Sequence, residues 1–405
     1  MSASYRFSHR SRQHFWVYVV TSLLLWLPGE VKAVSLLDGR LQVHGFVSQG
    51  MVNTTGNNFL GDSDDSISYD FREIAVNASY LARPELLFSA QVMSHRAGES
   101  DNGDPDIDYA FVDWTAFTGN WGRVGVRLGR VKNAFGLYNA TRDVPFTRAG
   151  VILPQSIYFE RTRKLSLSSD GVSFYADKST NVGTFSAEAT LGKPGLDKSS
   201  EAAIIPNTKG HFETDFTQLY QLKYESPTGQ YVFALTHVNL GVSYRRAVND
   251  TLQSGGFHFD PTLLSAQYNA ENWSLTSEYA RRPISLRGFG AIPNVGQVGE
   301  SYYVQGTYRV MPDWEIMLRY DAAYSNRDDR HGTSFAKKTG RPGFTQYSKD
   351  WTLGLRYDVT PAFMLRAEYH AIEGTSILPP LDNTAGVSAL EKRWDMFMLL
   401  GSYRF

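Results

Sequence analysis

Hydrophobic and polar residues alternate with a period of two along much of the chain, most clearly in its C-terminal half. From Trp314, one face of the pattern carries Ile316 and Leu318, whereas the other carries Glu315 and Arg319. A period of two indicates a β-strand with two different faces. The runs are about 10–14 residues long, which exceeds the ~5–6 residues of typical soluble strands and suits a tilted strand that crosses a bilayer. The pattern therefore predicts a sheet of unusually long strands.

Such runs recur sixteen times, an even number, as a single-chain bacterial barrel requires. Trp or Tyr side chains lie repeatedly at the ends of the apolar faces, where an interfacial aromatic girdle would place them. The predicted strands are 41–53, 67–81, 85–96, 106–118, 121–131, 165–177, 182–193, 212–225, 229–244, 256–270, 272–283, 300–311, 313–326, 346–359, 361–374 and 392–405.

The connections between the predicted strands alternate in length. Short turns such as 82–84, 118–120 and 311–313 alternate with long polar segments. The long segments are 54–66, 97–105, 132–164, 194–211, 245–255, 284–299, 327–345 and 375–391. Outer-membrane barrels have short periplasmic turns and long external loops, and they are closed because lipid cannot satisfy an open sheet edge. The sequence therefore predicts an all-β, transmembrane antiparallel barrel of about 16 strands over residues 34–405.

The first 33 residues differ from the rest of the chain. Arg6, Arg10 and Arg12 precede an apolar run over residues 15–27, and small residues near Ala33 suit a cleavage site. The apolar run is shorter than the ~20 residues that a membrane-spanning helix needs. We therefore interpret residues 1–33 as a secretory signal peptide. An uncleaved N-terminal anchor is the alternative.

Composition narrows the class of function. The 405 residues include no Cys, which excludes a disulfide scaffold, a Cys-ligated metal and a thiol nucleophile. The balance of 40 basic and 41 acidic residues leaves no positive excess for binding nucleic acid. Neither a Gly-x-Ser-x-Gly nor a His-Glu-x-x-His motif is present, and the His residues are scattered singly. We therefore expect no enzyme activity, no cofactor and no nucleic-acid partner.

Two acidic segments have the composition of cation sites. Asp62, Asp64 and Asp65 lie in the first long segment, and residues 101–108 (DNGDPDID) fill the second. Alternating carboxylates around a Gly suit hard cations such as calcium, but the spacing of an EF-hand is missing. We therefore expect loops that face solvent or lipopolysaccharide and assign no metal site. Binding of divalent cations is left open.

The two ends of the chain resemble those of a known group. With the N-terminal segment, residues 398–405 (MLLGSYRF) resemble the last strand of Gram-negative outer-membrane proteins. Residues 129–138 (GRVKNAFGLY) are similar to the passage from strand to third loop in sixteen-stranded porins, including the phosphate-selective type. The resemblance implies a homotrimer in the bacterial outer membrane, surrounded by lipid and lipopolysaccharide. It also implies that the barrel-assembly machinery reads the last strand and its terminal Phe405.

The third long connection, residues 131–164, is unusually long and unusually apolar. It has about 33 residues against a median of ~4–6, and includes Phe135, Val151 and Tyr158. The resemblance implies that it folds into the barrel and narrows the pore. Packing on itself or on a neighbouring subunit is the alternative. The predicted constriction residues are Lys132, Arg142, Asp143, Arg148, Glu160, Arg161, Arg163 and Lys164.

Basic side chains are also predicted on the inward faces of the strands. The residues expected to face the loop are Arg123, Arg127, Arg309, Arg319, Arg356 and Arg366. Basic rings in a narrow aqueous path favour anions. Carboxylates such as Glu278, Asp321 and Glu368 are predicted to point inward as well, and pairing with them would remove the preference. We therefore expect a porin for passive diffusion of small hydrophilic solutes with modest anion preference. An unselective channel and a non-conducting adhesin or receptor barrel are the alternatives.

Overall fold

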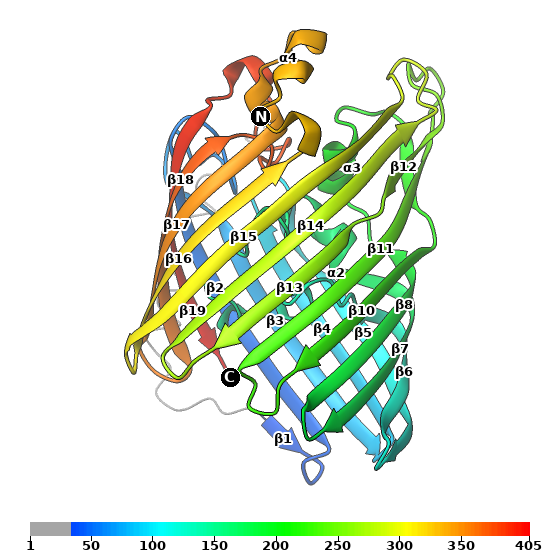
Figure 1. Ribbon diagram of the computed structural model, residues 1–405, viewed down its shortest axis with the longest axis vertical. Helices are drawn as coiled ribbons and strands as arrows, with labels where there is room; N and C mark the ends of the chain where they lie inside the picture. Colours follow the sequence, from blue (N-terminus) through cyan, green and yellow to red (C-terminus); the bar gives the residue numbers. More distant parts are fainter. Residues whose placement is uncertain (1–33) are drawn as a thin grey trace, which may run out of the picture.

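The computed structural model describes residues 34–405, which form one closed antiparallel β-barrel (Figure 1). The ring is closed by β2 (Leu41–Thr54) and β19 (Arg393–Arg404), with Gly50 facing Leu400 across the seam. The short β1 (Val34–Leu36) pairs with β2 at the end of the barrel that carries the short turns. The predicted signal peptide, residues 1–33, lies outside the described residues.

The wall contains sixteen strands, two of which are each divided into two segments. The undivided strands between β2 and β19 are β3 (Ser68–Arg83), β4 (Leu86–Ala97), β5 (Asp101–Gly119), β6 (Gly122–Lys132), β7 (Ser168–Thr180), β8 (Gly183–Pro194), β11 (Tyr231–Arg245), β14 (Trp273–Arg287), β15 (Val295–Met311), β16 (Trp314–Tyr324), β17 (Tyr347–Asp358) and β18 (Phe363–Gly374). The divided strands are β9 (His211–Thr214) with β10 (Thr217–Glu225), and β12 (Gly255–Phe259) with β13 (Thr262–Asn269). The second division falls at Pro261, which has no amide N–H for the ladder.

The predicted sixteen-stranded barrel is confirmed, and most predicted strands agree with the structure within a few residues. Two of the predicted long connections are wrong. Only residues 98–100 separate β4 from β5, and only residues 288–294 separate β14 from β15. At the start of β5 both faces are polar, so the alternation that indicates a strand disappears there although the backbone pairing with β4 continues. The end of β14 keeps apolar residues at Ile284 and Leu286, and its pairing with β15 continues beyond the predicted boundary.

The start of the strand predicted at 165–177 is also wrong. Residues Arg163–Leu167 form one helical turn, α2, and β7 begins at Ser168. Leu165 and Leu167 alternate with polar neighbours and so imitate a strand in the sequence. Both side chains are buried on this helical turn, which belongs to the connection between β6 and β7.

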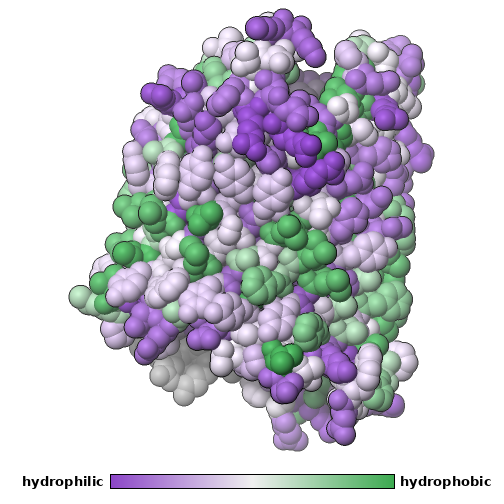
Figure 2. Space-filling view, viewed as in Figure 1, coloured by the Kyte–Doolittle hydropathy of each residue, from purple (hydrophilic) through white to green (hydrophobic). Residues whose placement is uncertain are grey.

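Side chains of the wall alternate between an exposed outer face and a buried inner face. On β16, Leu318 is 55% exposed, whereas its neighbours Met317 and Arg319 are buried. Figure 2 shows hydrophobic side chains across the middle and lower part of the visible wall, with hydrophilic side chains dominating the upper end. The inner face instead carries charged residues such as Arg319.

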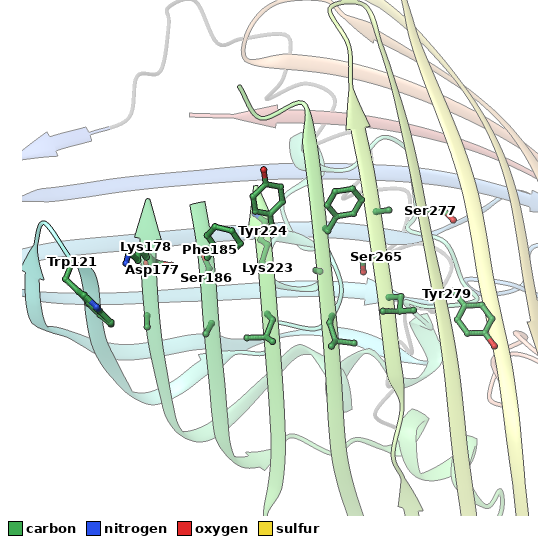
Figure 3. Close-up of a pocket in the computed structure, with 18 residues that line it drawn as sticks. Trp121, Asp177, Lys178, Phe185, Ser186, Lys223, Tyr224, Ser265, Ser277 and Tyr279 are labelled. Atoms are coloured by element: carbon green, nitrogen blue, oxygen red, sulfur yellow. The ribbon is translucent and has the colours of Figure 1, made fainter. Parts of the chain in front are cut away.

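The outer face of β7 to β14 contains a shallow apolar depression of about 770 Å³ (Figure 3). Phe185 and Tyr279 contribute large exposed side chains, and Ala187 and Ala266 contribute small ones between them. The depression therefore lies on the outside of the wall and belongs to the outward set of alternating residues.

The remaining helices are short segments in the long connections. Helices α3 (Lys198–Ile204) and α4 (Thr333–Thr339) lie toward the end of the barrel opposite the short turns (Figure 1). Within residues 34–405, no helix combines the length and the apolar character needed to cross a membrane.

Candidate pore-lining site

Residues 133–167, called loop 3 below, connect β6 to β7. Loop 3 includes three short 3₁₀ turns (Asn139–Thr141, Pro145–Thr147 and Glu160–Thr162) and α2. Every residue from 151 to 158 is buried. Loop 3 therefore packs against the rest of the chain along much of its length.

Carboxylates on the inner face of the wall accept hydrogen bonds from the backbone of loop 3. Ile152 N donates to Glu368 of β18 at 3.3 Å. Ser156 N donates to Asp321 of β16 at 3.2 Å. Because these carboxylates satisfy backbone N–H groups that would otherwise be buried without partners, they stabilise one path for the loop.

Glu278 of β14 accepts several hydrogen bonds at once. Tyr158 Oη donates to it at 2.7 Å, and Leu137 N donates at 3.0 Å. Ser265 and Tyr303 donate from neighbouring strands. Gly136 has a φ of +61°, and a Cβ there would lie 2.7 Å from Glu278 Oε1. A glycine therefore allows both the turn and the close approach of loop 3 to this carboxylate.

Arg148 connects loop 3 to β3. Its two terminal nitrogens donate to the two carboxylate oxygens of Glu73 at 2.9 and 2.5 Å. Both side chains are buried. Burial alone would lower the pKa of Arg148, but Glu73 outweighs this effect and raises the pKa above its ordinary value. The bidentate geometry is that of a strong, charge-assisted pair.

Five charged residues of β6 and loop 3 form a second connection, the anchor cluster: Lys132, Arg142, Asp143, Glu160 and Arg163. Arg142 donates to Glu160 at 3.1 Å. Asp143 accepts from Lys132 and from Arg163. Lys132 also pairs with Asp108 of β5 at 2.6 Å. With Asp108 included, three cations face three carboxylates, so the cluster is close to neutral.

The two carboxylates of the anchor cluster are held in their charged forms. Burial would raise the pKa of Asp143, but Arg163 and Lys132 outweigh it and hold the pKa well below the usual range. Burial likewise opposes ionisation of Glu160, and Arg142 and His95 more than compensate, so its pKa is lowered. These are ion pairs that hold the fold of the loop together.

The predicted constriction residues therefore differ in role from the expectation. Arg142, Arg148 and Arg163 are buried and paired instead of facing an aqueous gap, and Lys164 pairs with Asp106. The physical reason is that a buried cation without a counter-charge is costly. Arg161 differs from the others, as described below.

The predicted row of wall arginines is only partly assembled. Arg309, Arg356 and Arg366 lie in one cross-strand row, with Glu315 between the first two. Arg319 lies four residues further along β16 and faces Gln305 and Thr352 instead. Because Glu315 interrupts the row and Asp358 pairs with Arg356 at 2.9 Å, the belt is not purely basic.

Two of the wall arginines contact loop 3 directly. Arg366 donates to the carbonyl oxygens of Pro145 and Gly150 at 2.6 and 3.0 Å. Arg319 donates to the carbonyl oxygen of Ile152 at 3.3 Å. These residues hold the loop backbone and do not face it across water.

Arg123 and Arg127 of β6 belong to a separate group. Arg123 pairs with Asp177 at 2.6 Å, and Arg127 pairs with Asp113 at 3.1 Å. Their guanidinium carbons lie 5.1 and 4.6 Å from the centroid of the Tyr175 ring. The structure does not bring them to the anchor cluster.

Loop 3 and the inner face of β10, β11 and β14 enclose a cavity of about 300 Å³, called the arginine pocket below. Phe159 and Arg161 line it from the loop, and Arg282 lines it from β14. The guanidinium carbons of Arg161 and Arg282 lie 5.3 and 5.1 Å from the centroid of the Phe159 ring. Burial lowers the pKa of Arg161 to about 10, so it remains charged at neutral pH.

Glu73 and Arg282 belong to the site although the sequence pattern does not single them out. Both lie on inward positions of predicted strands, and Arg282 shares the face of Glu278 four residues earlier. Parity alone could have marked them as inward. Their partners could not be identified, because these depend on how loop 3 folds.

The acidic segment 101–108 is a paired part of β5, not a loop. Its residues pair with β4, and Asp106 and Asp108 are engaged by Lys164 and Lys132. In the described part of the chain, no group of three or more His, Cys, Asp or Glu side chains is arranged to hold a metal ion.

Comparison with solved structures identifies the same fold in outer-membrane proteins. An anion-selective porin from Comamonas acidovorans is 13% identical, with 90% of this chain and 99% of that chain covered and a TM-score of 0.57. The outer membrane channel DcaP of Acinetobacter baumannii is 12% identical (92% and 100% covered, TM-score 0.56). A trimer form of OmpT, an outer membrane protein of Vibrio cholerae, is also 12% identical (90% and 99%, TM-score 0.54).

No family model and no curated protein sequence matches the chain. At these identities the structural likeness shows the fold: a closed sixteen-stranded antiparallel barrel of the kind found in porins.

Proposed function

We propose that the chain is an outer-membrane porin, a water-filled barrel through which small hydrophilic solutes diffuse passively. The observation that carries the proposal is loop 3, which is bonded to the inner faces of β3, β14, β16 and β18 within a closed barrel. A connection held by buried ion pairs and hydrogen bonds to several strands sets a fixed cross-section. We propose that loop 3 is the pore constriction.

The outer face of the wall supports a position in the bacterial outer membrane. Large apolar side chains such as Leu222, Leu264 and Leu353 are more than half exposed on it. A lipid-facing band of this kind, on a barrel without open edges, suits the hydrocarbon interior of a bilayer. Export through a signal peptide, contact with lipopolysaccharide and assembly as a homotrimer complete the proposal, and one of the structural neighbours is described as a trimer form.

The charges support a modest preference for anions. The anchor cluster with Asp108 is balanced, and Arg148 is balanced by Glu73. Within residues 34–405, Arg161, Arg282 and Arg366 have no carboxylate within 4.0 Å. Unbalanced positive charge in a narrow path raises the local concentration of anions. We propose that the preference comes from Arg161 and Arg282, which line a cavity, and not from the whole basic set of loop 3.

Planar-bilayer recording of the purified protein tests the proposal. We expect discrete conductance steps in potassium chloride, and a reversal potential of the sign for anion preference in a salt gradient. Absence of steps from correctly folded protein would contradict the porin function and favour an adhesin or receptor barrel. A reversal potential of the opposite sign would contradict the anion preference alone.

A further inference from the structure

The inner wall beside the arginine pocket is apolar. The side chains that form this part of the wall point inward from β10, β11 and β14: Leu219, Val238, Leu240, Ile284 and Leu286. The interior of an outer-membrane barrel is usually polar. An apolar wall that lines a cavity is instead typical of a site for a ligand with an apolar body.

Two arginines lie at the edge of this apolar wall. Arg282 is 9% exposed, and its Nη2 donates to the carbonyl oxygens of Tyr324 and Glu300 at 3.2 and 3.4 Å. The buried Nε atoms of Arg282 and Arg161 have no hydrogen-bond partner among residues 34–405. The Arg161 side chain makes no hydrogen bond within residues 34–405, and Arg282 donates only through Nη2, so both guanidinium groups keep terminal donors for an acceptor that the described chain does not supply.

The charge of this pair is uncompensated. In the described residues no carboxylate lies within 4.0 Å of either guanidinium. Asp321 attracts Arg282 from further away, but its carboxylate accepts hydrogen bonds from Ser156. The Phe159 ring attracts a nearby cation, but this attraction is weaker than the cost of burying a charge. In the same loop the charge of Arg148 is fully compensated, because both carboxylate oxygens of Glu73 accept hydrogen bonds from it.

We propose that the arginine pocket binds amphipathic carboxylates, with the carboxylate at Arg161 and Arg282 and the apolar body against the wall of Val238 and Leu240. This inference deepens the proposed function, on which it rests, by naming a class of solute. The volume of about 300 Å³ lies at the small end of ligand sites and suits one aromatic ring or a short alkyl chain.

The two halves of the pocket require two properties of the ligand. A small hydrophilic anion such as acetate satisfies the arginines but leaves the apolar wall in contact with water. A neutral molecule of the same shape covers the wall but leaves the arginines without a counter-charge. A carboxylate joined to an aromatic ring satisfies both, so its affinity exceeds that of either fragment.

Isothermal titration calorimetry of the full chain in lipid nanodiscs tests this site without depending on conduction. The probes are phenylacetate, acetate and the neutral phenylacetamide. We expect phenylacetate to bind at least about tenfold more tightly than either of the other two, a difference of ~1.4 kcal/mol. Arg161→Gln and Arg282→Gln should each weaken phenylacetate binding by about tenfold or more, because each removes a charged hydrogen-bond donor.

Arg281→Gln is the matched control, because Arg281 is exposed on the outer face beside Arg282 and should leave phenylacetate binding unchanged. Equal affinities for phenylacetate and acetate, or unchanged binding in both pocket variants, would overturn the inference. Single-channel recording of the same preparations separates the two proposals. Conductance without selective binding of phenylacetate contradicts only the inference, whereas selective binding without conductance contradicts only the porin function.

Discussion

Loop 3 has arginines on two sides, and the surroundings of the two sides differ. Toward β3 and β5, Arg148 and Arg163 meet Glu73 and Asp143. Toward β10, β11 and β14, Arg161 meets an aromatic ring, a second arginine and an apolar wall. The first group uses its charge to fix the loop, and little of that charge is left without a counter-charge. The second group keeps its charge unbalanced at a cavity.

The contrast shows that the number of basic residues in loop 3 does not predict how much positive charge remains without a carboxylate partner. The same residue type anchors the loop where a carboxylate faces it and can attract a solute where none does. The comparison predicts opposite effects of neutralising the two groups. Changes on the paired side should alter stability, whereas changes on the unpaired side should alter selectivity and binding.

The largest expected effect on stability is at Glu73. In Glu73→Ala the buried Arg148 loses its counter-charge, and removal of one partner from a buried pair typically costs ~3–5 kcal/mol. We expect a lower free energy of unfolding in urea and faster proteolysis within loop 3. Asp177→Ala is the control, because its partner Arg123 is exposed, and such pairs contribute ~0–1 kcal/mol. Equal losses in the two variants would show that the Arg148 pair does not anchor the loop.

A somewhat smaller effect is expected at Glu278. Tyr158 donates to one carboxylate oxygen of Glu278 and Leu137 to the other, so the amide donor in Glu278→Gln faces one of these two donors, at a cost of ~1–3 kcal/mol. Glu225→Gln, at a half-exposed position near a turn, is the control. We expect noisier single-channel current from Glu278→Gln, because residues 137–158 are less firmly held. Current as quiet as that of the wild type would contradict this account of the carboxylate.

The smallest effect is the acid dependence of the anchor cluster. The pKa values of Asp143 and Glu160 are lowered in the folded protein from ordinary values of 3.8 and 4.5. Their contribution to stability is therefore complete above these ordinary values and is lost as the pH falls below them toward the folded-state values. We expect thermal stability to stay constant from about pH 7 to 5 and to decline below about pH 4. Asp143→Asn should reduce this decline. A decline that begins near pH 6 would indicate that other groups control the loop.

The barrel could be predicted from the sequence because successive residues of each strand alternate between an outer and an inner face of the wall. Leu318 and Arg319 are neighbours in the chain and lie on opposite sides of the wall, so parity alone separates them. This signal fails where both faces are polar. For that reason the sequence predicts a loop at the first residues of β5, although they pair with β4.

The site could be predicted only as a set of charges, not as an arrangement. Arg161 and Arg282 lie far apart in the chain and meet at Phe159 only because loop 3 folds back toward β14. Likewise, nothing in the local sequence of Arg148 indicates that Glu73 is its partner. Pairing across a long loop depends on tertiary packing, which alternation along single strands does not report.

The most direct test of the central claim is the reversal potential in a potassium chloride gradient, compared between two double variants. Arg161→Gln with Arg282→Gln removes two unbalanced charges, whereas Glu73→Gln with Arg148→Gln removes a balanced pair. We expect the first variant to shift the reversal potential toward cation preference and the second to leave it near the wild-type value. An equal shift in both, or a shift only in the second, would contradict the claim that selectivity comes from the arginines without carboxylate partners.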